Sequence, residues 1–261
     1  MQGGGIDVVD ARVLLRVVLG VDNAYLIAHG GDVVTAEHET KFRALAVRRI
    51  AGEPVAYIVG EREFYAHTFK VTPAVLIPRP ETELLVELAL QRNPRRVLDL
   101  GTGSGCIAIS VALACPDARV TALDRSPQAL AVARENAETL NARNVTLLIS
   151  DWYDAVRGER YDVIVSNPPY VAAGDAHLTQ GDLRFEPAVA LAAGEDGLAD
   201  IRIIVNGAST HLSPGGWLLF EHGYDQATRC RELLEQTGFA EVQSWRDLAG
   251  IERVSGGRAP L

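Results

Sequence analysis

Residues 166–170 read Ser-Asn-Pro-Pro-Tyr and directly follow the apolar run YDVIV, so a buried strand ends on an asparagine, two prolines and an aromatic residue. An amide or exocyclic amino nitrogen is a poor nucleophile because its lone pair is delocalised, and two acceptors that grip its N–H groups can hold it for attack. The side-chain carbonyl of Asn167 and the backbone carbonyl of Pro168 suit this task, and they would also stabilise positive charge that grows on the nitrogen. The pattern therefore predicts a cradle for an –NH2 group.

The prolines and the tyrosine serve this cradle in different ways. Pro168 and Pro169 bring no competing N–H group, and a following proline restricts the backbone of Asn167 and of Pro168. Tyr170 offers a flat face to a planar group and favours positive charge nearby. Because the product nitrogen can lose its proton to water, no general base is required, and the sequence offers no nucleophile–base pair that would indicate covalent catalysis.

A glycine-rich turn, DLGTGSG over residues 99–105, follows another apolar run. In open α/β sheets ligands bind at the carboxyl ends of the strands, where glycines let them approach the backbone. The dinucleotide fingerprint would need a glycine where Cys106 stands, and a dinucleotide also needs helix N–H groups for its pyrophosphate. The turn favours S-adenosylmethionine instead, with Asp99 near its amino group and Gly101, Gly103 and Gly105 beside its methionine and ribose.

Acidic and aromatic residues end the next two expected strands. Asp124 follows the turn by about 20 residues, where an acidic side chain can hold ribose hydroxyls. In SDWYD, Asp151 can read an adenine amino group and Trp152 can stack on a flat base. The alternatives are a tight turn without ligand and an ordinary core tryptophan, and the presence of Asp124 after the glycines favours a ligand.

Strands separated by helices of about a dozen residues follow from residue 95 onward, which indicates right-handed crossovers and a parallel sheet covered on both faces. The last two strands are joined too tightly for a crossover, so one strand should be reversed. We expect strands over 95–100, 119–124, 145–150, 161–167, 216–223, 240–248 and 251–258. We expect helices over 104–114, 127–141, 197–212 and 226–238.

The first third of the chain has a different organisation. Residues 6–51 show helical spacing, with Gly20 as a stop and Gly52 as a closing residue. Residues 53–77 are rich in β-branched and aromatic residues and predict one or two short hairpins. A helix should follow, with Pro80 in its first turn. We therefore expect a helical domain over 1–52, a hairpin linker over 53–77 and a ligand-binding α/β domain over 78–261.

Composition limits the class of protein. The 261 residues carry a formal net charge of −9, which disfavours a protein that mainly grips phosphate backbones. The three cysteines fit no zinc or redox spacing, and no metal site is expected. No apolar stretch could span a bilayer, and the start MQGGGIDVVD lacks the layout of a signal peptide. We expect a soluble, cytoplasmic protein.

These segments together resemble the HemK/PrmC family, the protein-(glutamine-N5) methyltransferases that act on peptide chain release factors. The resemblance covers essentially the whole chain, through the linker with PRPETE, then DLGTGSGCIAIS, ALDRSPQAL, SDWYD, SNPPYV and EPAVALAAGEDGL in the family's order. NPPY alone also occurs in DNA and other amino methyltransferases, whereas NPPY with PRPETE and SDW is highly specific. Two departures are Ala66, where the family often has glycine, and an N-terminus shorter than the family's by a helix.

The resemblance implies an N-terminal helical domain joined by a hairpin to a seven-stranded Rossmann-like methyltransferase sheet. It also implies S-adenosyl-L-methionine as methyl donor, S-adenosyl-L-homocysteine as product, and the glutamine of the release-factor Gly-Gly-Gln loop as substrate. Arg79 and Glu81 would be ties that brace the pocket from the linker. The implied cofactor residues are Gly101, Thr102, Gly103, Ser104, Gly105, Asp124, Trp152 and Asn167. The implied substrate residues are Asn167, Pro168, Pro169 and Tyr170.

Four other functions compete with this interpretation. A DNA adenine-N6 methyltransferase would flip its base into the same cradle, but it needs a basic groove, and the chain is acidic. A glutamine methyltransferase of a ribosomal protein differs only in substrate, and the PRPETE linker favours release factors. A non-catalytic binding module is disfavoured by the intact motifs, and a nicotinamide oxidoreductase by Cys106. We expect no direct contact with nucleic acid or membrane.

Overall fold

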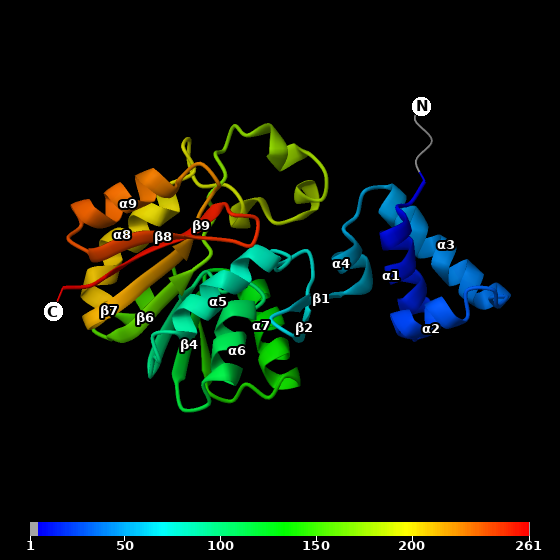
Figure 1. Cartoon of the computed structure of the whole chain (residues 1–261), viewed down its shortest axis with the longest axis horizontal. Helices are drawn as coiled ribbons and strands as arrows, with labels where there is room; N and C mark the ends of the chain where they lie inside the picture. The colour runs from blue at the N-terminus through cyan, green and yellow to red at the C-terminus, as the bar shows by residue number, and fades with distance from the viewer. Residues whose placement is uncertain (1–4, 261) are drawn as a thin grey trace.

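The computed structural model describes residues 5–260, which form a group of N-terminal helices, a short hairpin and a seven-stranded sheet flanked by helices (Figure 1). Residues 1–4, which begin the predicted first domain, and residue 261 lie outside the described residues. The architecture confirms the expected fold class. The domain boundaries at residues 52 and 77 stay a prediction.

The N-terminal helices begin at polar caps, and the first of them ends at Gly20 as expected. They are α1 (Val8–Leu19), α2 (Asn23–Ala28) and α3 (Ala36–Ile50). The side chains of Asp7, Asp22 and Thr35 each accept a hydrogen bond from a backbone N–H of the first helical turn, which would otherwise have no partner. Gly20 ends α1 with a φ of 67°, a left-handed conformation that glycine adopts at little cost.

The linker holds one hairpin, and its first part is helical. Residues Val55–Val59 form α4, a helix in a linker where only short hairpins were expected. Tertiary contacts explain the difference, because Tyr57 and Ile58 are buried and the Tyr57 hydroxyl donates to the carbonyl of Val75 at 2.6 Å. The hairpin itself consists of β1 (Glu61–Phe64) and β2 (His67–Lys70).

The hairpin turns through two residues with left-handed backbones. Phe64 pairs with His67, and the turn residues Tyr65 and Ala66 have φ values of 48° and 60°. Two-residue turns of this kind favour glycine because side chains with a Cβ are strained at positive φ. The departure at Ala66 therefore leaves the hairpin formed but with an unfavourable residue at its tip.

The remaining elements alternate as the sequence predicts. A 3₁₀ turn, η1 (Pro80–Thr82), leads into α5 (Glu83–Leu90). The strands are β3 (Arg96–Leu100), β4 (Arg119–Asp124), β5 (Val145–Ile149), β6 (Tyr161–Ser166), β7 (Leu212–Glu221), β8 (Ala240–Arg246) and β9 (Glu252–Arg258). The helices are α6 (Cys106–Ala114), α7 (Pro127–Thr139), α8 (Ala199–His211) and α9 (Ala227–Gln236).

The strands of the large sheet run in the order β5-β4-β3-β6-β7-β9-β8. Neighbouring strands from β5 to β7 pair in parallel, whereas β9 pairs antiparallel with both β7 and β8. One reversed strand was expected and is confirmed. Strand β7 starts at Leu212, directly after α8, and is therefore longer than the expected strand over 216–223.

Helices cover both faces of this sheet, and successive strand residues pack into two separate cores. Helices α5 and α6 cover one face, where Val97, Val163 and Leu219 join their core. On the opposite face α8 and α9 pack on Leu98 and Ile164. Figure 1 shows the two helical layers on either side of the strands. Burial on both faces explains the near-continuous apolar strands.

A long segment between β6 and α8, yellow-green in Figure 1, reaches toward the N-terminal helices. It contains the short 3₁₀ turns η3 (Ala176–Thr179), η4 (Leu183–Phe185) and η5 (Ala188–Ala190). Arg49 of α3 forms an ion pair with Asp182 at 2.9 Å, and Arg184 donates to the carbonyl of Ala51 at 2.8 Å. Between residues 5 and 260 no helix is both long and apolar enough to cross a membrane.

Candidate functional site

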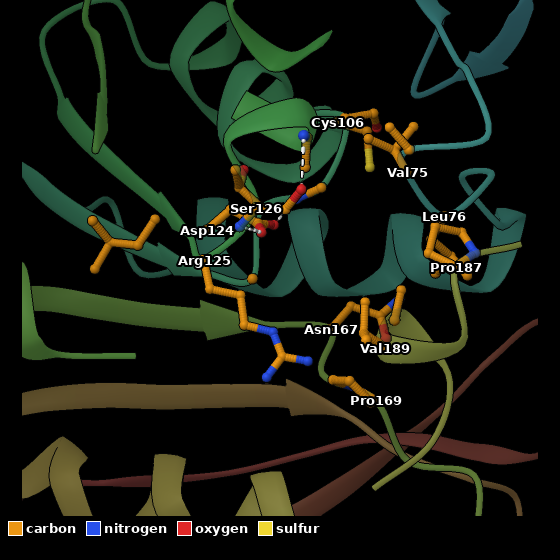
Figure 2. Close-up of a pocket in the computed structure, with 18 of the residues that line it drawn as sticks. Val75, Leu76, Cys106, Asp124, Arg125, Ser126, Asn167, Pro169, Pro187 and Val189 are labelled. Carbon is orange, nitrogen blue, oxygen red and sulfur yellow. Dashed lines mark hydrogen bonds between the residues drawn. The ribbon is translucent and has the colours of Figure 1, made fainter. Parts of the chain in front are cut away.

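A cavity of about 310 Å³ lies at the carboxyl ends of β3, β4 and β6. Its walls come from several separate parts of the chain. Figure 2 shows Leu76 of the linker, Asp124 at the end of β4, Asn167 after β6 and Val189 of the 171–197 segment around this space. Ligands of doubly wound sheets bind at this edge, where neighbouring crossovers leave a crevice between them.

The glycine turn after β3 forms one wall of the cavity. The backbone N–H groups of Gly101 and Thr102 both donate to the carbonyl of Leu123 at 2.9 Å, which fixes the turn to the end of β4. Gly101 and Gly103 have positive φ values of 72° and 56°. Both line the cavity, as do Thr102 and Ser104, so the turn presents its backbone to a ligand.

Asp124 is held rigidly at the end of β4. Its Oδ2 accepts a hydrogen bond from the backbone N–H of Gly103 at 2.9 Å, and its Oδ1 accepts one from Ser126 at 2.8 Å. Ser126 also caps α7, because its hydroxyl accepts from the N–H of Ala129. A carboxylate oxygen has further lone pairs. Asp124 can therefore accept hydroxyl groups of a ligand while the backbone keeps it in position.

Two residues predicted for the cofactor, Asp99 and Gly105, do not line the cavity. Asp99 is fully buried behind Thr102, whose hydroxyl donates to its Oδ2 at 2.6 Å. Burial raises the pKa of Asp99 to about 7. A Cβ at Gly105 would lie 2.8 Å from Cδ1 of Ile109 and 3.2 Å from Cβ of Ala133. Gly105 therefore permits the packing of α6 on α7.

Asp151 and Trp152, the residues predicted to contact adenine, both line the cavity beyond β5. Trp152 has a φ of 45°, and the Ser150 hydroxyl holds this strained residue by donating to its carbonyl at 2.8 Å. Sequence reasoning missed two charged residues here, Arg125 and Asp200, which also line the cavity. Burial raises the pKa of Asp200, and the positive charge of Arg125 opposes that shift.

The SNPPY segment forms the opposite wall. Asn167 and Pro169 line the cavity, whereas Pro168 is buried and Tyr170 stands behind them. The Asn167 Nδ2 group donates to the Thr82 hydroxyl at 3.1 Å. Among the described residues its carbonyl oxygen Oδ1 has no hydrogen-bond partner, although it is buried. Such an acceptor is rare in native proteins, and it is available to a donor group of a ligand in the cavity.

Tyr170 is fixed at both ends. Its hydroxyl donates to Oε1 of Glu221 at 3.1 Å, and its backbone carbonyl accepts from Nε2 of Gln226 at 2.9 Å. Burial raises the pKa of the Tyr170 hydroxyl, and the Glu221 carboxylate raises it further. The tyrosine therefore stays protonated, and its ring is held rigidly at the rear of the SNPPY turn.

The linker residue Arg79, predicted as a tie, pairs with Glu186. The Glu186 side chain is fully buried, and its Oε2 also accepts from the backbone N–H of Ile77 at 3.0 Å. These bonds join the linker to the segment that carries Pro187 and Val189 over the cavity. Glu186 is the first residue of the segment EPAVALAAGEDGL. An acidic residue in that segment is the signal that could have identified the buried partner of Arg79.

Thr82 and Glu221 are site residues that sequence reasoning missed. Thr82 lines the cavity and donates its hydroxyl hydrogen to Oε2 of Glu221 at 2.6 Å. Thr82 lies inside PRPETE, and Glu221 ends β7 at the same edge of the sheet as the SNPPY segment. A carboxylate at the carboxyl end of a parallel strand is the signal that would have identified Glu221.

Two family models match the chain. The one described as the PrmC N-terminal domain matches residues 2–60, and the one described as the methyltransferase small domain matches residues 80–244. A release factor glutamine methyltransferase of Bordetella pertussis is 58% identical over 258 residues, which cover 97% of this chain and 95% of that protein. The protein of the same name from Escherichia coli is 44% identical over 252 residues and covers 95% of this chain and 91% of its own length.

Solved structures share the fold at lower identity. A methyltransferase from Pyrococcus furiosus aligns with a TM-score of 0.59 and 20% identity over 82% of this chain and 98% of that one. A 16S rRNA methyltransferase of T. thermophilus, solved with AdoMet and guanosine, aligns with a TM-score of 0.56 and 23% identity over 76% of this chain and 49% of that one. The seven-stranded sheet and its crossovers are therefore a methyltransferase architecture.

Proposed function

The chain belongs to the family of release factor glutamine methyltransferases, and from this membership we propose that it methylates the side-chain amide nitrogen of the glutamine in the Gly-Gly-Gln motif of a peptide chain release factor. The observation that carries the proposal is the carbonyl oxygen of Asn167, a buried acceptor without a partner among the described residues, in the cavity wall. A primary amide that enters the cavity supplies the N–H group that this oxygen lacks.

The cavity residues fit S-adenosyl-L-methionine. The backbone of the glycine turn would hold the methionine and ribose portions, Asp124 would accept ribose hydroxyls, and Trp152 would stack on the adenine beside Asp151, since all of these residues line the cavity. When bound, this cofactor supplies a methyl group on a positively charged sulfur, which makes the carbon electrophilic. Because the site needs no pyrophosphate contact, the place of Cys106 at the start of α6 is compatible with this ligand.

The residues after β6 orient the substrate. Asn167 accepts one N–H of the glutamine amide through its Oδ1, and the backbone carbonyl of Pro168 accepts the other. This grip places the nitrogen lone pair along the line of attack and stabilises the charge that develops on it. The extra proton then passes to water, so no side chain of the site has to act as a base.

The proposed substrate also gives the N-terminal helices a role. The match of residues 2–60 to the PrmC N-terminal domain supports a role of these helices in recognising the release factor. A substrate that acts on the ribosome implies that the enzyme works in the cytoplasm. The same proposal makes a protein, and neither DNA nor a membrane, the direct partner.

Mass spectrometry of a purified release factor tests this function. The release factor is incubated with the enzyme and S-adenosyl-L-methionine, and the peptide with the Gly-Gly-Gln motif is analysed. We expect one added methyl group on the glutamine, none with a release factor whose motif glutamine is replaced by alanine, and methylation about 100-fold slower or more with the Asn167→Ala enzyme. No methyl group on that peptide, with the cofactor still bound in calorimetry, would redirect the search to ribosomal proteins and then to DNA.

A further inference from the structure

Three residues from distant parts of the sequence form a chain of hydrogen bonds that ends at the cavity. The hydroxyl of Thr82 donates to Oε2 of Glu221 at 2.6 Å, and the Nδ2 group of Asn167 donates to the same hydroxyl oxygen at 3.1 Å. Strand pairing creates this arrangement, because Ser166 of β6 pairs with Phe220 of β7 and the next residues are Asn167 and Glu221. The turn η1 brings Thr82 between their side chains.

Which group donates in each of these hydrogen bonds follows from the number of protons that Thr82, Glu221 and Asn167 can offer. When Glu221 is ionised its carboxylate only accepts, so the single hydroxyl proton of Thr82 points to it. The Thr82 oxygen is then available as an acceptor alone, and the asparagine must turn its NH2 group toward it. The other end of the amide, Oδ1, remains free of partners among the described residues and is available to the substrate.

We propose that Glu221, acting through Thr82, sets the orientation of the Asn167 side-chain amide so that it presents an acceptor to the substrate nitrogen. This inference rests on the proposed function, in which the substrate group is an –NH2. With the opposite orientation, the Asn167 NH2 would face the –NH2 of glutamine, two donors would meet, and the nitrogen would not be held for attack. Thr82 and Glu221 are therefore positioning residues.

The surroundings of Glu221 fit this role. The residue is 1% exposed, and the Tyr170 hydroxyl supplies a second donor to its other oxygen at 3.1 Å. Both carboxylate oxygens thus accept from groups of the substrate-facing wall. The charged and titratable groups that face Glu221 are Arg253 of β9, Glu81 of η1, Tyr170 after β6 and Cys106 of α6.

Protonation of Glu221 should allow the Asn167 side-chain amide to turn over. A neutral carboxyl group can donate to the Thr82 oxygen, after which the Thr82 proton is free to point at Asn167 and its amide can turn over. Burial raises the pKa of Glu221, while the hydrogen bonds from Thr82 and Tyr170 lower it and so oppose that shift. The ionised form is the active one, so kcat should fall as the pH decreases through that pKa.

The test measures kcat with saturating release factor and cofactor for Thr82→Val, Thr82→Ser and Glu221→Gln, each with and without Asn167→Ala. Valine removes the hydroxyl at nearly constant volume, serine keeps it, and glutamine offers a donor where the carboxylate only accepts. We expect Thr82→Val and Glu221→Gln to lower kcat by about 10- to 100-fold, as is typical when a group that orients a functional side chain is removed. Thr82→Ser, which keeps the hydroxyl group, should have a kcat close to that of the wild type.

The double variants separate positioning from a structural role. If Glu221 and Thr82 act through Asn167, neither Glu221→Gln nor Thr82→Val should lower kcat further once Asn167 is alanine. An additive loss in that background, or an unchanged kcat in both single variants with folding intact by circular dichroism, would overturn the inference. In the wild type the acid limb of the kcat profile should be present, and Glu221→Gln should remove it.

A measurement without substrate keeps this inference distinct from the proposed function. In amide-proton NMR of the enzyme alone, the Asn167 side-chain NH2 should show one proton shifted by its bond to Thr82, and that shift should disappear in Thr82→Val and persist in Thr82→Ser. An NH2 signal that does not respond to Thr82→Val overturns the inference. A normal NMR response together with an unmethylated release factor would instead reject the proposed substrate.

Discussion

At the scale of single residues, Trp152 tests how the cavity binds its cofactor. The indole lines the cavity at the end proposed for adenine and also packs on the core under α8. Stacking of an aromatic side chain on a base contributes about 1–3 kcal/mol, so we expect Trp152→Ala to raise the cofactor Kd by about 5- to 150-fold. Isothermal calorimetry measures this effect. Trp245→Ala is the matched control, because Trp245 packs against Trp217 and does not line the cavity.

Asp99 predicts a pH dependence of cofactor binding. Burial raises its pKa to about 7, so the carboxylate is ionised at pH 8 and largely protonated at pH 6. If its charge attracts the cofactor's ammonium group, the Kd should increase by about tenfold as the pH falls over this window. The Asp99→Asn variant should bind weakly at both pH values. A wild-type Kd that does not change would mean that Asp99 holds Thr102 and leaves the amino group to other residues.

At the scale of elements, the hairpin tip predicts a stabilising substitution. Ala66 has a φ of 60°, a conformation that costs a residue with a Cβ about 1–2 kcal/mol, and glycine avoids this cost while losing about 0.5–1 kcal/mol of chain entropy. Ala66→Gly should therefore increase the free energy of unfolding by about 0.5–1 kcal/mol. Thermal and urea denaturation measure it.

A second glycine substitution in the same hairpin is the control. Thr68 is exposed and extended in β2, where glycine has only the entropic disadvantage. Thr68→Gly should lower the stability, and a gain at both positions would mean that the hairpin responds to flexibility and not to the sign of φ at Ala66.

At the scale of the whole molecule, Arg49 connects the N-terminal helices to the segment over the cavity. Its guanidinium donates to Asp10 of α1 at 2.6 Å and to Asp182 at 2.9 Å, and Pro187 and Val189 of the same segment line the cavity. We expect Arg49→Ala to increase hydrogen–deuterium exchange over residues 180–190 and to leave β3 and β6 protected.

Arg43→Ala is the control for that experiment. Arg43 lies in the same helix and pairs with Glu39 one turn away, and its side chain is 75% exposed. Such a pair contributes little to stability, so exchange over 180–190 should match the wild type. Equal protection in the Arg49 and Arg43 variants would show that the ion pair with Asp182 does not hold the segment.

The sequence by itself determined the features that depend on neighbours along the chain. The helix caps, the stop at Gly20 and the alternation of strands and helices follow from local hydrogen bonds and from periodicity. It also brought the glycine turn, Asp124 and Asn167 to one edge, because parallel strands joined by right-handed crossovers all end on the same side of a sheet. Sequence patterns therefore predicted the edge of the sheet at which the cavity lies.

The tertiary structure decided which groups meet at that edge. The contact of Thr82, Asn167 and Glu221 depends on the pairing of β6 with β7, and no local pattern specifies which strands become neighbours. Residue spacing also could not show that Asp99 and Gly105 lie behind the cavity wall. A sequence motif specifies the order of its residues along the chain, but it does not specify which of them are exposed to the cavity. Burial of Tyr57 made α4 a helix against its β-branched composition, because packing contributes more than intrinsic propensity.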